Sequence, residues 1–172
     1  YNKLKNEGAT SYILDIRNNT GGYVDTAEKI IGMFPNANYA YKLIDYTGTS
    51  LVKANTNNNL RAIFPKDTKI LVNGMSASAS DMLAAAVKDQ KAALLYGSTT
   101  YGKGTMQMLF RVGNGQYYIK LTIAEFQSPH GNKIDSIGID PDVPSEIPLQ
   151  LAHLDTIVAK LNRYKMLPKM EK

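Results

Sequence analysis

Residues 68–89 have the sequence TKILVNGMSASASDMLAAAVKD, in which an apolar run is followed by a helical pattern. Residues 68–73 form a short apolar run between polar residues, which is typical of a strand buried on both faces. Residues 76–89 begin with serines and continue with alanines and other good helix formers, which indicates a serine-capped helix. A buried strand that leads directly into a helix is the basic unit of α/β proteins.

The flanking sequence continues this alternation of apolar runs and helical patterns. Residues 11–17 form another buried run, the polar sequence NNTGG interrupts the chain at 18–22, and apolar residues at helical spacing follow as far as Pro35. Gly113-Asn114-Gly115 separates two apolar runs and favours an antiparallel hairpin. The remaining predicted elements are strands at 39–45, 92–96, 106–112 and 117–127, and a helix at about 149–164. We therefore expect one α/β domain over residues 1–172, with a mixed sheet, an antiparallel hairpin and a C-terminal helix.

Ser76, Ser78 and Ser80 are candidate nucleophiles, because they lie where the buried run of 68–73 gives way to a helix. At such a junction a side chain is exposed at the end of the sheet, and backbone N–H groups point outward. A serine there can attack a carbonyl group while neighbouring N–H groups bind the oxyanion. A purely structural role is also open, since Ser78 with Asp81 matches a helix capping box. Composition alone does not choose among the three serines.

Lys103 is a second candidate, because it lies between two glycines in residues 101–104, YGKG. A neutral lysine can accept the proton of a serine, and burial in an apolar pocket favours the neutral form. Gln107 lies four residues later, on the same side of an extended chain, where it could hydrogen-bond the amine. His130 and His153, in a loop and on the terminal helix, suit the role of base poorly. The structural alternative is an exposed lysine on a flexible glycine loop.

Gly21 and Gly22 form the third candidate feature, at the turn between the first buried run and the following helix. A bend of two glycines before a helix presents backbone N–H groups as an anion-binding nest. This turn can donate to an oxyanion, or it can be a simple connection between a strand and a helix.

Composition excludes several classes of protein. The 172 residues contain no cysteine, which excludes disulfides, zinc–thiolate sites, iron–sulfur clusters and a cysteine nucleophile. The net charge of +5 comes from scattered lysines without a basic block, so nucleic acid is not an expected partner. The apolar runs are far shorter than the roughly 20 residues that cross a bilayer, so no transmembrane segment is expected.

Four segments together resemble the C-terminal processing (tail-specific) serine proteases, peptidase family S41. Residues 13–22, ILDIRNNTGG, are similar to the family segment LDLRNNPGG, and residues 70–81, ILVNGMSASASD, are similar to VLVN.GSASASE. Residues 101–107, YGKGTMQ, resemble FGKGSVQ, and residues 138–143, GIDPDV, resemble GI.PDV. Each segment is weak alone, but the four occur in the family's order and span most of the chain.

The resemblance implies a role for particular residues. The family nucleophile lies three residues before an acidic residue and 25 residues before the lysine base, which selects Ser78 and Lys103. Gln107 would orient Lys103. The backbone N–H groups of Ala79 and of Gly22, in preference to Gly21, would form the oxyanion hole. The resemblance further implies a ClpP/crotonase-like core of β-β-α units that hydrolyses polypeptides through an acyl-enzyme, often near their C-termini, without metal or organic cofactor.

Three departures from the family pattern accompany this expectation. Met75 replaces the usual glycine, Asp81 replaces the usual glutamate, and nothing in the chain resembles the PDZ domain that usually lies upstream. We therefore expect a catalytic core without a PDZ domain, in the bacterial periplasm, envelope or secreted fraction, and compatible with a homo-oligomer. The alternative is a catalytically silent peptide-binding or structural domain that keeps the fold. An acyl-CoA enzyme of the related crotonase fold is disfavoured, because it would not need the pair of Ser78 and Lys103.

Overall fold

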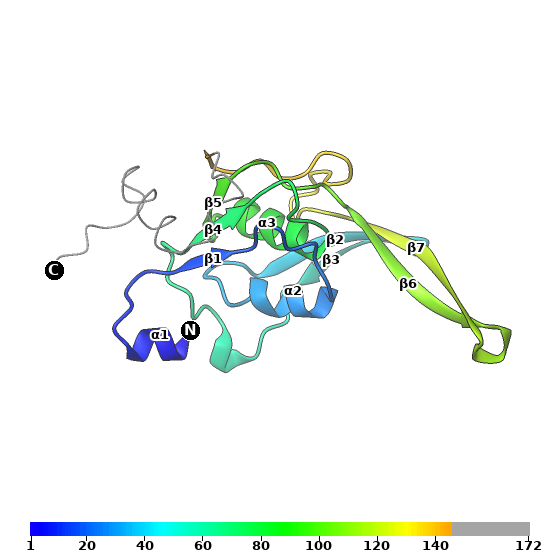
Figure 1. Cartoon of the computed structure of the whole chain (residues 1–172), viewed down its shortest axis with the longest axis horizontal. Coiled ribbons are helices and arrows are strands. Elements are labelled where there is room, and N and C mark those ends of the chain that lie inside the picture. The colour runs from blue at the N-terminus through cyan, green and yellow to red at the C-terminus, as the bar shows by residue number, and fades with distance from the viewer. Residues whose placement is uncertain (146–172) are drawn as a thin grey trace.

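The computed structural model describes residues 1–145, which fold into two β-sheets with helices packed between and around them (Figure 1). The first sheet is parallel, in the order β1-β4-β5-β8, with β1 at Ile13–Asp15, β4 at Lys69–Val72, β5 at Leu94–Gly97 and β8 at Val143–Pro144. The second is antiparallel, in the order β3-β2-β7-β6, with β2 at Tyr39–Asp45, β3 at Gly48–Lys53, β6 at Thr105–Val112 and β7 at Tyr117–Gln127. The α/β class that the sequence predicts is confirmed.

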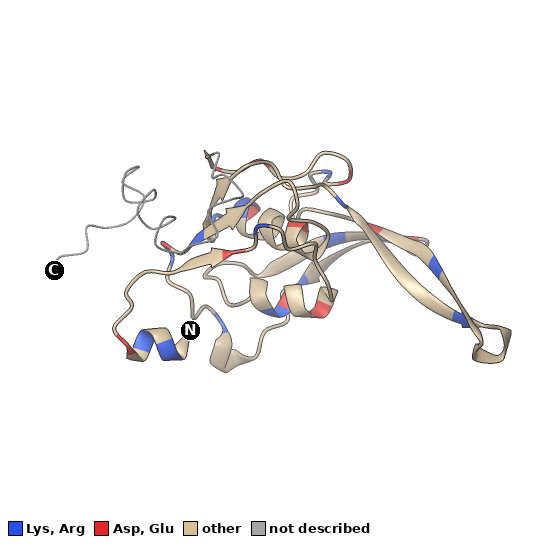
Figure 2. Cartoon of the chain, in the orientation of Figure 1, with Lys and Arg blue, Asp and Glu red and all other residues tan. Residues whose placement is uncertain are grey.

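Three α-helices lie within the described residues: α1 at Asn2–Asn6, α2 at Val24–Ile31 and α3 at Ala79–Asp89. Short 3-10 turns occur at Asn58–Leu60 and Gly113–Gly115. None of the helices within residues 1–145 is long and apolar enough to cross a membrane. Figure 2 shows lysines and arginines spread over helices, strands and loops of this part of the chain, as their scatter along the sequence suggests.

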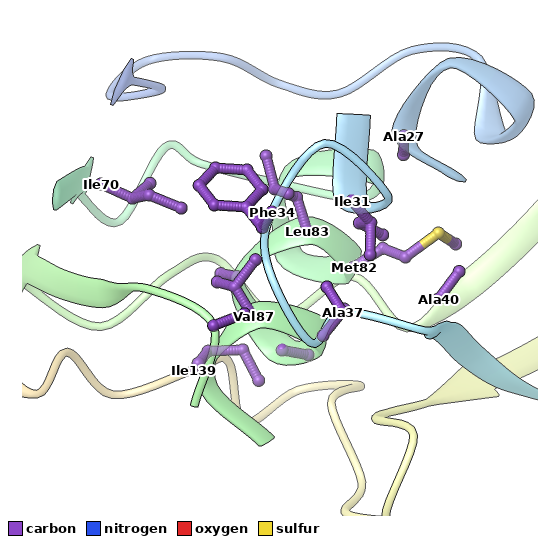
Figure 3. Packing of buried hydrophobic residues seen from close by; sticks show 14 of the residues in the cluster. Ala27, Ile31, Phe34, Ala37, Ala40, Ile70, Met82, Leu83, Val87 and Ile139 are labelled. Atoms are coloured by element: carbon purple, nitrogen blue, oxygen red, sulfur yellow. The ribbon is translucent and has the colours of Figure 1, made fainter. Parts of the chain in front are cut away.

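Helix α3 is buried on nearly all sides, because it packs against β5 of the parallel sheet, β2 of the antiparallel sheet and helix α2. A helix with apolar residues all round its surface is stable only in such a position. The run Ala84–Ala86 gives α3 a small cross-section that lets both sheets approach it. Figure 3 shows Met82, Leu83 and Val87 of α3 packed with Ile31 and Phe34 in this core.

The parallel sheet ends at the loops that carry the candidate residues. All four residues of β4 are buried, and this strand is paired on both sides, with Ile70 opposite Leu14 and Leu95. The carboxyl ends of β1, β4 and β5 therefore lie next to one another. Three segments follow these three ends in chain order: the turn of Gly21 and Gly22, the serine loop (residues 73–78) and the lysine loop (residues 98–104).

The β6–β7 hairpin extends beyond the body as a two-stranded ribbon (Figure 1). Strand β2 pairs with residues 125–127 of β7, so within residues 1–145 the outer part of the hairpin has no third strand beside it. On one face of this ribbon the side chains are all apolar, in the cross-strand pairs Met108–Leu121, Phe110–Ile119 and Val112–Tyr117. Charged residues Lys120 and Arg111 lie on the opposite face.

The predicted elements largely coincide with the observed ones. The strand predicted at 11–17 is shorter, at Ile13–Asp15, and the helix predicted from 76 begins at Ala79. That start is delayed because Ser78 has φ 58° and ψ −113°, which no helix accommodates. The helix predicted at about 149–164 lies outside the described residues. Strands β3 and β8 and helix α1 were not predicted.

Candidate active site

The serine loop between β4 and α3 presents one of the three candidate serines to solvent. Ser76 is fully buried, and its hydroxyl donates to the backbone carbonyl of Ile16 at 2.8 Å and accepts from the N–H of Asn73 at 3.0 Å. Ser80 is 5% exposed. Ser78 is half-buried and is the N-cap residue, immediately before the first turn of α3. Among the three, Ser78 is thus the accessible one, and Ser76 holds the loop in place.

The backbone of Ser78 has a positive φ of 58°, a conformation that residues other than glycine rarely adopt. Asp81 holds it there: its Oδ2 accepts a hydrogen bond from the Ser78 N–H at 2.7 Å. This contact is the carboxylate half of the capping box that the sequence suggests.

Asp81 also binds the lysine loop. Its Oδ2 accepts from the Lys103 N–H at 2.9 Å, and its Oδ1 accepts from the Gly102 N–H at 3.0 Å. The Asp81 side chain is fully buried. The structure thus brings Ser78 and Lys103 together, because their backbone nitrogens contact the same carboxylate oxygen.

Lys103 is half-buried, and its Nζ donates to Oε1 of Gln107 at 3.3 Å. The four-residue spacing predicts this hydrogen bond, and it is present at the start of β6. Within residues 1–145 no carboxylate forms a salt bridge with the Lys103 amine.

The lysine loop is packed tightly between two other segments. The N–H of Tyr101 donates to the carbonyl of Ser76 at 2.9 Å, and the carbonyl of Gly102 accepts from the N–H of Ser136 at 2.7 Å. Gly102 has φ +84°, and a Cβ at this position would lie 2.5 Å from the backbone nitrogen of Gly138. Only glycine fits here without a shift of the backbone. The YGKG segment is therefore a packed loop in which Lys103 is half-buried.

The turn of Gly21 and Gly22 lies directly against the serine loop. A Cβ on Gly21 would lie 2.6 Å from the carbonyl oxygen of Ala77 and 2.8 Å from the nitrogen of Ala79. The N–H of Gly21 donates to Oδ1 of Asn19, at 2.9 Å. Among residues 1–145, the N–H groups of Gly22 and Ala79 have no hydrogen-bond acceptor. Of the two glycines, Gly22 is thus the one whose N–H is left without an acceptor among residues 1–145.

A pocket of about 390 Å³ opens beside these two N–H groups. Its apolar walls include Leu14, Ile16, Ile30 and Leu83, and Gly21, Gly22 and Ala79 line its edge. Asp15 also lines it, with its carboxylate paired to the guanidinium of Arg17 at 2.6 Å. The pocket has the size and lining to hold a small apolar group.

Two other expectations concern residues around the site. Met75, which replaces the family's usual glycine, is 51% exposed and does not line the pocket. His130 is exposed in its turn, where its backbone N–H donates to Asp89.

The bridging bonds of Asp81 to Gly102 and Lys103 were not predicted. The only sequence signal for them is an acidic residue three positions after a serine, which a helix cap explains equally well.

Comparisons with known proteins identify the family of this chain. Residues 1–145 match Peptidase_S41, peptidase family S41. A carboxyl-terminal-processing protease of Synechocystis sp. is 36% identical over 148 residues, which cover 86% of this chain and 34% of the relative. The carboxy-terminal processing protease CtpA of Bacillus subtilis is 34% identical over 156 residues, which cover 88% of this chain and 32% of the relative. The chain thus spans about a third of the length of these relatives.

The fold is also found in solved structures. The photosystem II D1 C-terminal processing protease has a TM-score of 0.71 and 33% identity, and the match covers 84% of this chain and 36% of that one. A lipoprotein from Streptococcus agalactiae, at 22% identity and a TM-score of 0.70, shares the fold, with 94% of this chain and 58% of that one covered. The two-sheet architecture is consistent with the ClpP/crotonase-like core that the resemblance implies. The chain belongs to peptidase family S41.

Proposed function

We propose that this chain supplies the catalytic core of a serine peptidase, in which Ser78 is the nucleophile, Lys103 the base and Gln107 the residue that orients the base. One observation carries the proposal. Ser78 and Lys103 are 25 residues apart in the sequence, yet their backbone N–H groups share one oxygen of Asp81. A domain that only binds peptides would need neither the shared contact nor the hydrogen bond from Lys103 to Gln107.

The reaction follows from these positions. Neutral Lys103 takes the proton of the Ser78 hydroxyl as Oγ attacks the scissile carbonyl carbon. The oxyanion of the tetrahedral intermediate accepts hydrogen bonds from the N–H groups of Gly22 and Ala79. The C–N bond then breaks, and Lys103 returns the proton to the leaving amine, which leaves an ester on Ser78. Lys103 then takes a proton from water as the water oxygen attacks this ester, and it returns that proton to Oγ of Ser78 as the C–O bond breaks and the acid leaves.

The pocket beside the proposed oxyanion donors supports an apolar substrate side chain near the scissile bond. Its walls of Leu14, Ile16, Ile30 and Leu83 disfavour a charged side chain, because burial without a partner costs several kcal/mol. Strand β6, which begins next to Lys103, is an edge strand whose free backbone groups can pair with an extended peptide. We propose unfolded polypeptides as substrates.

The names of relatives support two further parts of the proposal. Relatives from cyanobacteria, plants and Bacillus subtilis are named carboxyl-terminal or C-terminal processing enzymes, which supports cleavage near substrate C-termini. The relatives of Tetradesmus obliquus and Arabidopsis thaliana are named chloroplastic. We propose an extracytoplasmic location for this chain.

The experiment compares cleavage of an unstructured polypeptide, such as β-casein, by the wild-type chain and by Ser78→Ala, Lys103→Ala and Gln107→Ala, with products mapped by mass spectrometry. The matched controls are Ser50→Ala and Lys91→Ala, at exposed positions on β3 and after α3. We expect no cleavage by the first two variants and a loss of about tenfold to a hundredfold for Gln107→Ala. Cleavage that persists in Ser78→Ala contradicts the proposal.

The pH dependence provides a second arm of this experiment. Activity should fall on the acid side of the profile, because protonated Lys103 cannot accept the Ser78 proton. Peptide that binds to the wild-type chain and is never cleaved at any pH would instead identify a catalytically silent peptide-binding domain.

A further inference from the structure

We infer that Asp81 is a positioning residue that fixes the nucleophile relative to its base. The inference rests on the proposed function, because it concerns how Ser78 and Lys103 reach a reactive arrangement. Within residues 1–145 the Asp81 carboxylate accepts hydrogen bonds from backbone N–H groups and from neither the Ser78 hydroxyl nor the Lys103 amine. It acts through the backbone of these two residues.

Each of the three hydrogen bonds to Asp81 comes from a backbone N–H. Oδ2 accepts from Ser78 at 2.7 Å and from Lys103 at 2.9 Å, while Oδ1 accepts from Gly102 at 3.0 Å. The residue has no exposed surface, and within residues 1–145 no cation pairs with it. The donors are thus its only described partners. Bonds from N–H groups to a carboxylate are stronger than bonds to a neutral acceptor.

Two of these bonds exceed what a helix cap requires. A capping residue at this position needs only the bond to Ser78, three residues earlier. Gly102 and Lys103 lie 21 and 22 residues further along the chain and belong to a different loop. Asp81 therefore sets the separation between the two loops as well as the start of α3.

The serine side of the bridge needs this support. Ser78 has φ 58° and ψ −113°, and an unsupported serine would relax toward an ordinary backbone conformation. Such a relaxation would move the nucleophile away from the lysine loop. A displacement of about 1 Å in a reacting group can cost about a hundredfold in rate.

The fold itself depends less on Asp81. The lysine loop has other attachments, since Tyr101 N–H donates to the Ser76 carbonyl and Ser136 N–H donates to the Gly102 carbonyl. Helix α3 is held by its apolar contacts with both sheets. Loss of Asp81 is thus expected to change the alignment of the loops before it unfolds the chain.

Asp81→Asn tests the bridge with almost no change of shape. The amide has one acceptor oxygen and an NH₂ group that only donates, so it cannot accept all three hydrogen bonds. Whichever way it is oriented, the NH₂ group faces at least one backbone N–H. Asp81→Glu keeps the charge and both acceptors and adds one methylene.

The experiment measures kcat and KM of these variants on an internally quenched peptide with an apolar residue near the scissile bond. We expect Asp81→Asn to lower kcat about a hundredfold with KM changed less than about threefold, as misalignment without lost binding predicts. Asp81→Glu should recover kcat to within about tenfold of wild type, because the carboxylate is kept. In Asp81→Ala, added formate should restore part of the rate, with chloride at the same concentration as the control.

Asp89→Asn is the matched control. Asp89 ends the same helix, and its carboxylate accepts the backbone N–H of His130 at 2.8 Å, far from the serine loop. Asp89→Asn should lower the free energy of unfolding in urea about as much as Asp81→Asn does, but it should keep the wild-type kcat. Suppose that the wild-type chain cleaves the peptide and that Ser78→Ala does not. A kcat of Asp81→Asn equal to that of the wild type then overturns the inference about Asp81 and leaves the proposed function intact. A wild-type chain that does not cleave overturns the proposed function instead.

Discussion

Ser78 has a backbone conformation that carries a free-energy cost. A non-glycine residue at φ 58° and ψ −113° lies outside the favoured regions, at a cost of order 1–3 kcal/mol. The surrounding bonds compensate for it: Asp81 accepts the Ser78 N–H, and the Ser76 hydroxyl ties the loop to the carbonyl of Ile16. Strain at a single residue that two neighbours hold in place is typical of a functional position.

Ser78→Gly should therefore stabilise the chain while it removes the nucleophile. Glycine adopts a positive φ without steric conflict, but it also has more conformational freedom in the unfolded chain, which offsets part of this advantage. We expect the free energy of unfolding of Ser78→Gly to exceed that of Ser78→Ala by about 1 kcal/mol. Urea unfolding followed by circular dichroism measures the difference. Equal free energies of unfolding for Ser78→Gly and Ser78→Ala would show that the residue is not strained.

Short-range relations among the site residues could be predicted from the sequence, and long-range ones could not. The four-residue spacing between Lys103 and Gln107 predicts their hydrogen bond, because an extended chain places them on one side. The residues alone did not separate Ser76 from Ser78, since the difference depends on a bond from Ser76 to Ile16, 60 residues away. The hydrogen bonds from Gly102 and Lys103 to Asp81 could not be predicted for the same reason, because they join two loops that are distant in the sequence.

Tyr41 of β2 joins the antiparallel sheet to helix α2, because its hydroxyl donates to Oε1 of Glu28 at 3.0 Å. Burial, and then the negative charge of Glu28, raise the pKa of the Tyr41 phenol above its ordinary value of 10.0. In the unfolded chain the phenol loses its proton near pH 10, while the folded chain retains it. The folded state is thus favoured below that pH and loses this contribution as the pH rises above 10.

Tyr41→Phe tests this link between the two elements. The variant should be less stable at pH 7 by about 1–2 kcal/mol, since it loses a hydrogen bond to a carboxylate. Its stability should also fall less steeply between pH 9 and 11 than that of the wild type, because its unfolded state has one proton fewer to release. Urea unfolding across this pH range measures both effects. Tyr46→Phe, on the 97% exposed Tyr46, is the control and should keep the wild-type slope.

Elements with strong patterns were predicted closely, and weakly patterned elements were missed. Strands β2 and β7 have the predicted bounds of 39–45 and 117–127, because apolar residues and turn residues mark both of their ends. Strand β3 was missed: its burial pattern is mostly exposed, and it is held by pairing with β2 at the edge of the sheet. Such a strand depends on its neighbour more than on its own composition.

The arrangement of the whole molecule depends on how two sheets share one helix. The sequence predicts a mixed sheet, whereas the strands divide into a parallel and an antiparallel sheet on either side of α3. The small alanine side chains of α3 let both sheets approach the helix closely. Alanine is common in buried and exposed helices alike, so its presence did not predict two separate sheets. The antiparallel sheet then continues outward as the β6–β7 ribbon (Figure 1).

The apolar face of this ribbon governs how the chain should behave in solution. Along β6, Met106 packs against the core, and Met108, Phe110 and Val112 continue the same face beyond the body. With their partners on β7 they form a face of six apolar side chains, each at least 36% exposed. A contiguous apolar patch of this kind favours association, because burial removes apolar area from water.

We therefore predict that the chain of 172 residues self-associates through this face, with a sedimentation coefficient that rises with concentration. Ile119→Lys places a charge among the apolar residues and should abolish the rise, since burial of an unpaired charge is costly. Leu109→Lys is the matched control: Leu109 is 63% exposed but lies on the opposite face, opposite Lys120. Sedimentation velocity of the three proteins over the same concentrations measures the effect. Association that persists in Ile119→Lys, or that Leu109→Lys abolishes equally, would place the contact elsewhere on the molecule.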